Sequence, residues 1–221
     1  MKKTILLLLV VSLVSVASAQ IQITEWMYKG NGGEFIEFTN VGDTAIDLTG
    51  WKYEDAHHQV NDQPSYYDLS GFGVVAAGES VILTEDDAAA FRADWSLGAN
   101  VKVLGLLGDD SLAPNEGHNI GKNDTINIFN AVMDIVDSLT YVGDDKDDPI
   151  NFIYTRDISG NVPVGALGAD DYTQAALSQV GDIYGSYTST SGDIGNPGSY
   201  VPEPAALALL GLGGLLIRRK K

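Results

Sequence analysis

Four aspartates around one lysine form the densest acidic stretch of this chain, at Asp144, Asp145, Asp147 and Asp148. Calcium takes six to eight oxygen ligands, and closely spaced carboxylates supply several of them. The stretch does not fit an EF-hand loop, which needs Gly at position 6 and Glu at position 12. The sequence therefore predicts either a calcium loop of another kind or a solvated loop of mutually repelling charges. It predicts no other cofactor.

Residue patterns typical of enzymes are missing from the sequence. His57 and His58 are adjacent, and neighbours on a strand point to opposite faces, so they are poor joint metal ligands; His118 stands alone. The chain has no H-E-x-x-H, no G-x-S-x-G and no phosphate-binding glycine loop. The absence of cysteine excludes thiol catalysis. A glycosidase needs two opposed carboxylates, but a chain this rich in acids always offers some pair. We predict that the protein is not an enzyme.

The distribution of charge excludes one class of partner. The whole chain has 13 Lys and Arg against 30 Asp and Glu. Residues 1–19 and 201–221 carry six of those cations and one acid, so residues 20–200 have a net charge of −22. Phosphate binding needs clustered Lys and Arg, so nucleic acid is excluded as a partner.

The body of the chain has the pattern of an all-β protein. Short, β-rich stretches alternate with Gly, Asn and Asp turns at roughly 8–12-residue spacing, which is typical of a β-sandwich. Ile36 and Phe38 are expected on one face of their strand. Acids followed by alanines predict one short helix over 85–95. The predicted strands cover 21–28, 34–40, 45–53, 67–69, 74–75, 80–84, 101–106, 125–130 and 137–142.

The N-terminus has the order of a secretory signal peptide. Lys2 and Lys3 precede an apolar stretch over 5–16, and Ala17 and Ala19 then give a small-x-small exit. We predict a signal peptide over 1–19 that signal peptidase removes before Gln20.

The C-terminus has a different order. Pro204 favours the start of a helix, and the residues from 205 to 217 are apolar except for three glycines. The run is shorter than the roughly 20 residues of a standard membrane span, but 201–217 fits a locally thinned bilayer. We predict a transmembrane helix whose cations face the cytoplasm, leaving the body of the protein outside. Those cations are Arg218, Arg219, Lys220 and Lys221.

This last segment resembles the PEP-CTERM sorting signal of exported proteins from Gram-negative bacteria. The resemblance rests on Val201, Pro202, Glu203 and Pro204, the apolar helix and the basic end. It implies that an exosortase, a membrane transpeptidase-like enzyme, recognises Pro-Glu-Pro, cleaves the chain and transfers it to the cell surface or extracellular matrix. Anchoring in the inner membrane is then transient. The resemblance describes a processing address over 201–221 and implies no activity for the mature chain.

A second resemblance covers the domain between these ends. Its motifs resemble a lamin-tail domain at Ile23–Glu25, Gly33–Glu37, Asn40–Gly42 and Asp47–Trp51, and again at 77–86, 123–141 and 192–200. The resemblance implies an immunoglobulin-like β-sandwich over 20–200. Residues 143–190 are longer and more polar than that fold needs, so we expect an insertion loop or partly disordered flap there.

Two sorting signals around a sandwich without catalytic motifs predict a non-catalytic exported protein with an adhesive or structural role. The alternative is a carbohydrate- or calcium-dependent binding module, with extracellular polysaccharide as its partner. That alternative rests on Trp26, Tyr66, Tyr67 and the acids of 144–148. Trp51 is expected in the core, with a sugar-stacking platform as the other interpretation. An extracellular hydrolase is the least favoured function.

Overall fold

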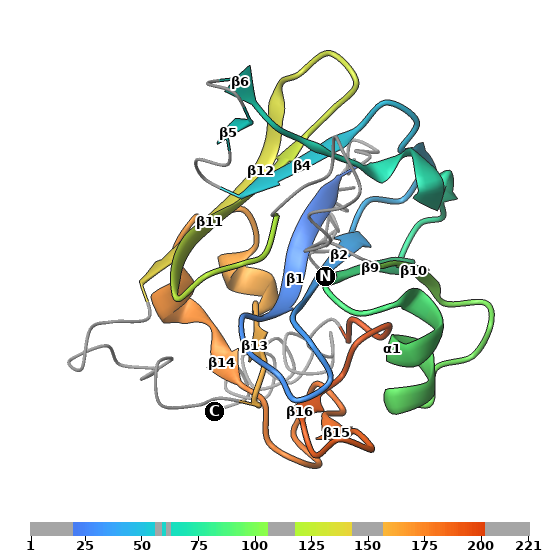
Figure 1. The fold of residues 1–221 in the computed structure, drawn as a ribbon, viewed down its shortest axis with the longest axis vertical. Helices are drawn as coiled ribbons and strands as arrows, with labels where there is room; N and C mark the ends of the chain where they lie inside the picture. Colours follow the sequence, from blue (N-terminus) through green and yellow to red (C-terminus); the bar gives the residue numbers. More distant parts are fainter. Residues whose placement is uncertain (1–19, 56–58, 61–62, 106–117, 143–156, 202–221) are drawn as a thin grey trace, which may run out of the picture.

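The structure is a computed structural model that describes residues 20–55, 59–60, 63–105, 118–142 and 157–201. Two β-sheets make up its centre (Figure 1). The larger has the strand order β10-β9-β2-β1-β13-β14, antiparallel except between β10 and β9. Its strands are β10 (Lys102–Leu104), β9 (Ser80–Thr84), β2 (Phe35–Asn40), β1 (Ile21–Met27), β13 (Gly160–Asn161) and β14 (Ala176–Leu177).

The smaller sheet is antiparallel and has the order β12-β11-β4-β7. Its strands are β12 (Ile135–Val142), β11 (Asn123–Phe129), β4 (Lys52–Asp55) and β7 (Tyr67–Asp68). Three two-stranded pairs complete the described strands: β3 (Ile46–Asp47) with β8 (Val74–Val75), β5 (Gln59–Val60) with β6 (Gln63–Pro64), and β15 (Tyr187–Thr188) with β16 (Ile194–Gly195). β-Strands are thus the main regular structure of the described residues, with one short α-helix, as the sequence predicts.

The main core fills the space between the two sheets. Trp26, Ile36 and Phe38 come from the larger sheet, and Tyr53 and Ile128 come from the smaller one. The expected shared face of Ile36 and Phe38 is confirmed. The larger sheet uses alternate residues for this core because successive side chains of a strand point to opposite faces. Its other face therefore needs a separate cover.

One short helix, α1 (Ala88–Asp94), covers part of that other face. Phe35 and Ile82 of the sheet pack there against Phe91 and Trp95 in a second apolar cluster. The Asp87 carboxylate begins the helix by accepting hydrogen bonds from the Ala89 and Ala90 N–H groups. In Figure 1, α1 and the orange-red C-terminal segment lie beside each other at the same end of the molecule, below β9 and β10.

The 3₁₀-helices and three pairs of short strands depart from the sequence prediction: β5 with β6, β13 with β14, and β15 with β16. Among the described residues, the 3₁₀-helices are η1 (Leu69–Phe72), η3 (Val164–Ala166) and η4 (Tyr172–Gln174). Within the range expected to be a loop or flap, 143–190, the described part from residue 157 adds β13 and β14 to the larger sheet. Each strand has only two residues, and β13 pairs with Glu25 and Trp26. A two-residue strand carries no readable alternation, so the pattern could not reveal this pairing.

No helix among the described residues is long and apolar enough to cross a membrane. Apart from Val201, the predicted membrane segment over 201–217 lies outside the described ranges, as does the predicted signal peptide over 1–19. Both stay predictions.

Candidate functional site

The described ranges contain two of the predicted processing residues. Gln20, the expected new N-terminus, is exposed and directly precedes β1. Val201, the first residue of the sorting segment, is half-buried. The other predicted site residues, together with His57 and His58, lie outside the described ranges: Ala17, Ala19, Asp144, Asp145, Asp147, Asp148, Pro202, Glu203, Pro204, Arg218, Arg219, Lys220 and Lys221. The candidate calcium loop stays a prediction, and the described residues contain no group of metal-binding side chains.

Two glutamates on neighbouring strands lie in the interior. Glu25 of β1 and Glu37 of β2 are cross-strand partners, and each is 0% exposed. The pairing register of β1 with β2 shifts between Ile23 and Glu25. The residues of β1 that face the main core therefore alternate with a different phase before and after this point. Both carboxylates lie on the same face of the larger sheet as Phe35 and Met27, which pack in the α1 cluster, but on the part of that face that α1 does not cover. A buried carboxylate needs hydrogen-bond donors around it. The donors to Glu25 and Glu37 therefore identify the segments of the chain that these two side chains hold in place.

The Glu37 carboxylate joins the sheet to the C-terminal end of the domain. Its Oε1 accepts a hydrogen bond from Thr24 Oγ1 at 2.7 Å and a longer one from Thr39 Oγ1 at 3.4 Å. Its Oε2 accepts from the Gly198 N–H at 2.6 Å. Ser80 Oγ lies 2.7 Å from Thr39 Oγ1 and accepts a hydrogen bond from the Tyr200 N–H at 3.3 Å. One carboxylate therefore binds two strands and a turn 161 residues further along the chain.

The Glu25 carboxylate makes a parallel connection. Its Oε1 accepts hydrogen bonds from the Asn196 N–H at 2.9 Å and from the Ser159 hydroxyl. Ser159 Oγ is 2.6 Å from Ser178 Oγ, which accepts a hydrogen bond from Asn161 Nδ2 at 2.7 Å. This polar network connects β1, β13 and the C-terminal end of the domain, and all of its side chains are buried.

We call residues 193–200 the closing segment. Besides its bonds to the two glutamates, it accepts hydrogen bonds at its start, where Asp193 receives the Asn31 and Gly32 N–H groups at 2.8 Å each. Inside it, Asn196 Nδ2 donates to the Ser199 carbonyl at 2.9 Å. The closing segment covers the part of this face of the larger sheet that contains Glu25 and Glu37. Helix α1 covers the apolar part of the same face. It ends directly before Val201, where the predicted sorting signal begins.

Burial shifts the acid–base equilibria of both glutamates. Desolvation raises the pKa of Glu25 well above its ordinary value, and the neighbouring Glu37 charge raises it further, against the hydrogen bonds from Ser159 and Asn196. Desolvation also raises the pKa of Glu37, opposed by donors that include Thr24 and Gly198. Neither carboxylate reaches solvent, so this pair offers no surface to a substrate. Its chemistry is that of holding the closing segment.

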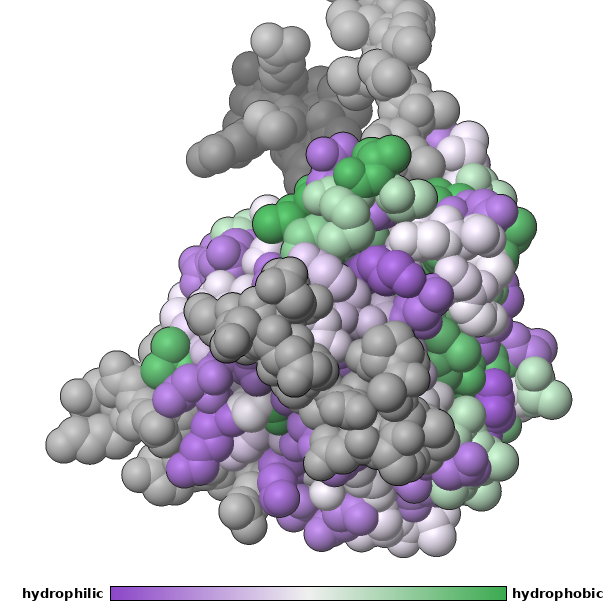
Figure 2. Space-filling model, turned by 45° about the horizontal axis from the view of Figure 1, so that its top comes forward, coloured by the Kyte–Doolittle hydropathy of each residue, from purple (hydrophilic) through white to green (hydrophobic). Residues whose placement is uncertain are grey.

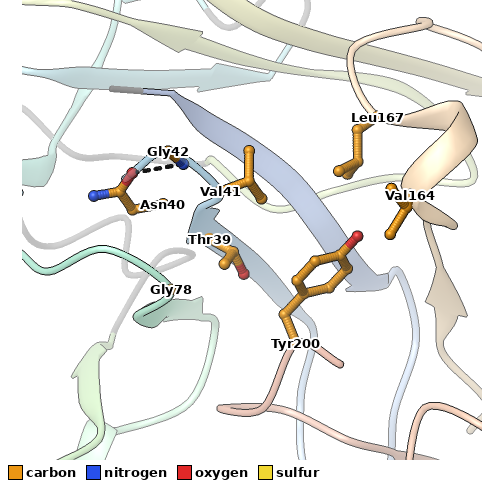
Figure 3. A pocket seen from close by; sticks show the side chains of 8 residues that line it. All are labelled: Thr39, Asn40, Val41, Gly42, Gly78, Val164, Leu167 and Tyr200. Carbon is orange, nitrogen blue, oxygen red and sulfur yellow. Dashed lines mark hydrogen bonds between the residues drawn. The ribbon is translucent and has the colours of Figure 1, made fainter. Parts of the chain in front are cut away.

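A hollow of about 330 Å³ opens beside the end of the closing segment. The Tyr200 ring forms one side of it, and Val164 and Leu167, from η3 and the residue after it, face that ring in Figure 3. The other lining residues are Thr39, Asn40, Val41, Gly42 and Gly78. Asn40 fixes the Val41 turn, because its Oδ1 accepts from the Gly42 N–H at 3.1 Å and its Nδ2 donates to the Thr44 carbonyl (Figure 3).

The aromatic residues proposed for sugar binding do not form a platform. Trp26 is fully buried in the main core, which corrects the expectation that it faces a ligand. Tyr67 is buried, and its hydroxyl donates to the Gly105 carbonyl at 2.7 Å. Tyr66 packs edge-on against Phe129 at 5.6 Å between ring centroids. Trp51 packs, partly buried, against the main core, which confirms the favoured interpretation of that residue.

His118 is also a core residue. It is fully buried, and its Nδ1 lies 3.5 Å from an Asp55 carboxylate oxygen. Its Nε2 lies 3.2 Å from the Ser65 hydroxyl. Tyr53 and Tyr67 pack against the ring at centroid distances of 6.2 and 6.5 Å. These contacts give His118 a packing role.

Apolar side chains are exposed at several separate places. Hydrophilic and intermediate residues cover most of the face seen in Figure 2, and apolar residues gather near its upper edge. Of the described residues, those with large exposed apolar side chains are Val74, Val132, Met133, Ile135, Val142, Val164, Val180 and Ile183. Among these, Val164 is the one that lines the hollow.

The buried glutamates are the residues that sequence reasoning missed. Both stand in the motifs quoted for the lamin-tail resemblance, as do Asn196 and Gly198 at its end. The available signal was an acid in each of two strands that also contain Thr24 and Thr39, whose hydroxyls can donate hydrogen bonds to a carboxylate. The sequence did not show that the partner segment lay at the other end of the domain.

Comparison with protein families gives two matches. The Lamin Tail Domain family model matches residues 15–143, and the PEP-CTERM protein-sorting motif matches residues 201–221. Both resemblances drawn from the sequence are confirmed. The first match ends before β13, β14 and the closing segment, which the structure joins to the same sheet. A search of curated proteins finds no match to the chain.

Proposed function

The chain belongs to the lamin tail domain family, and on that premise we propose that its mature form is a non-catalytic structural or adhesive protein of the cell surface or extracellular matrix. The PEP-CTERM motif indicates export, targeting to the bacterial cell envelope and processing by an exosortase-type system. The immunoglobulin-like sandwich, the Gram-negative host and the matrix location are the finer parts of the proposal. The observation that carries it is the sorting motif placed directly after the last residue of a folded domain.

Three further observations support a non-catalytic role. Glu25 and Glu37, which lie opposite each other on neighbouring strands, accept hydrogen bonds from groups within the domain. His118 is enclosed by aromatic rings. The hollow beside Tyr200 is lined by uncharged residues and so lacks the acid or base that most hydrolases need. A structural or adhesive domain needs a stable body and a means of delivery, and this chain has both.

The delivery step gives a direct prediction. Replacing Pro202, Glu203 and Pro204 together by alanine should leave the protein in the membrane fraction of its host, with its C-terminal tail intact. The reason is that the processing enzyme loses its recognition element while the apolar segment and the cations stay in place. Cell fractionation followed by immunoblotting measures the distribution of the full-length chain.

A matched control is Gly211→Ala, which keeps Pro-Glu-Pro and the basic end and removes a helix-weakening glycine from the apolar run. This variant should reach the surface fraction as the unsubstituted chain does. If the triple-alanine variant also reaches the surface with its tail removed, sorting by this motif is disproved.

A further inference from the structure

We propose that the hollow beside Tyr200 is a docking surface for the membrane enzyme that processes the sorting segment. This inference rests on the proposed function, because it requires that such an enzyme acts on Pro202–Pro204. It goes beyond that function by assigning part of the recognition to the folded domain. The hollow then receives an apolar side chain of the enzyme while the enzyme binds the motif.

The chain between the folded domain and the Pro-Glu-Pro motif has a short reach. The backbone of the closing segment is fixed as far as Tyr200, whose N–H donates to Ser80 Oγ, and Gly198 is held by the buried Glu37. An extended chain spans at most about 3.6 Å per residue, so Glu203 lies within roughly 11 Å of Tyr200. A single helix with its side chains is about 10–12 Å across. A protein that binds Glu203 therefore also contacts the surface of the domain around Tyr200.

The surface around Tyr200 is uncharged and partly apolar. The domain carries a net charge of −22, yet none of the eight residues that line the hollow is charged. Val41, Val164 and Leu167 are not fully buried, and Val164 is 44% exposed. Figure 3 shows Val164 and Leu167 facing the Tyr200 ring across the hollow. Burying such side chains against an apolar partner is favourable, at roughly 25 cal/mol per Å² of apolar surface.

Hydrogen bonds hold the rim of the hollow in place on two sides. The turn at Val41 is held by Asn40, whose side chain bonds the Gly42 N–H and the Thr44 and Val75 carbonyls. The Tyr200 side is held through the buried network of Glu37. A surface that is already formed loses little conformational entropy on binding, which favours a specific partner over loose contact.

The test uses the full chain in its own host and follows tail removal by pulse-chase and mass. Val164→Asp places a carboxylate at the rim and should slow tail removal about tenfold, which corresponds to about 1.4 kcal/mol. Val132→Asp is the matched control: Val132 is 75% exposed, lies between β11 and β12 and lines no part of the hollow. It should be processed at the unsubstituted rate.

A linker separates docking from other causes. Ten Gly and Ser residues inserted between Tyr200 and Val201 let the enzyme bind the motif without touching the domain. In that background Val164→Asp should have no effect on the rate. The proposal is overturned if Val164→Asp is processed as fast as the unsubstituted chain. It is also overturned if the variant stays slow with the linker, since a folding defect or the chain's own tail in the hollow then explains the result. If the unsubstituted chain keeps its tail, the proposed function fails and this inference with it.

Discussion

Replacing Glu37 by alanine is expected to lower the free energy of unfolding by about 3–5 kcal/mol, because it removes the acceptor of three hydrogen bonds and leaves a gap in the interior. Thr24 Oγ1 and the Gly198 N–H lose short hydrogen bonds of 2.7 and 2.6 Å, and Thr39 Oγ1 loses a longer one. Gly198 belongs to the closing segment, so that segment should also become the first site of proteolytic cleavage. Urea unfolding at pH 7 and limited proteolysis with mass mapping measure the two effects.

Two further variants sharpen this result. Glu37→Gln keeps an acceptor oxygen in nearly the same volume and should cost less than half as much as the alanine variant. Asp43→Ala removes an exposed acid from the turn that follows β2, and should change the free energy of unfolding by less than about 0.5 kcal/mol. If Glu37→Ala unfolds at the same urea concentration as Asp43→Ala, the buried network does not hold the closing segment.

Stability should fall as pH rises from about 5 to 8. Burial and the nearby Glu85 charge raise the pKa of Glu34 from 4.5 to about 8, and burial raises that of Asp137 from 3.8 to about 6. Glu25 and Glu37 are shifted in the same direction. Between its unfolded and folded pKa values such an acid binds more protons in the folded state, so the free energy of unfolding decreases with rising pH.

Glu34 makes a contribution to this slope whose size follows from its pKa shift. Its shift corresponds to roughly 3–5 kcal/mol, with some reduction because the side chain is partly exposed. Urea unfolding at pH 5 and pH 8 measures the difference. Glu34→Gln should flatten this slope, whereas Asp47→Asn, which alters an exposed acid whose pKa is lowered, should not. Equal stability at the two pH values would show that these acids are hydrated in the folded protein.

The order of the strands along the chain could be predicted from local pattern. The stretches with Ile36 and Phe38, with Val81 and Leu83, and with Ile126 and Ile128 all alternate, because every second side chain enters the main core. The helix was predicted from acids and alanines, and the structure shortens it to begin after its Asp87 cap. These features depend on neighbours a few residues apart.

The arrangement around the glutamates could not be predicted in this way. An acid at Glu25 or Glu37 in an alternating strand normally indicates a solvent-facing position, since exposed faces carry polar residues. Here the face is covered by a segment about 160 residues away, and a single sequence does not show such a long-range pairing. β13 and β14 were expected to be loop for another reason: each has two residues, which is too short for a readable alternation.

The segment that the buried glutamates hold and the sorting motif lie close to each other along the chain, at the C-terminal end of the domain. Glu25 and Glu37 hold residues 196 and 198, and the processing address follows a few residues later. The folded domain therefore extends to Tyr200, and the sorting motif begins at the next residue. Removal of 201–221 then leaves every described element of the sandwich intact, which suits a protein that acts after its address is lost.

The most direct test of this account is the intact mass of the mature protein, isolated from the surface or matrix fraction of its host. The account predicts a chain that begins at Gln20 and ends between Val201 and Pro204, with any mass that the transfer step adds at that end. A surface chain that still carries Arg218–Lys221 would contradict it, because the C-terminal segment would then be a permanent anchor and not a sorting signal.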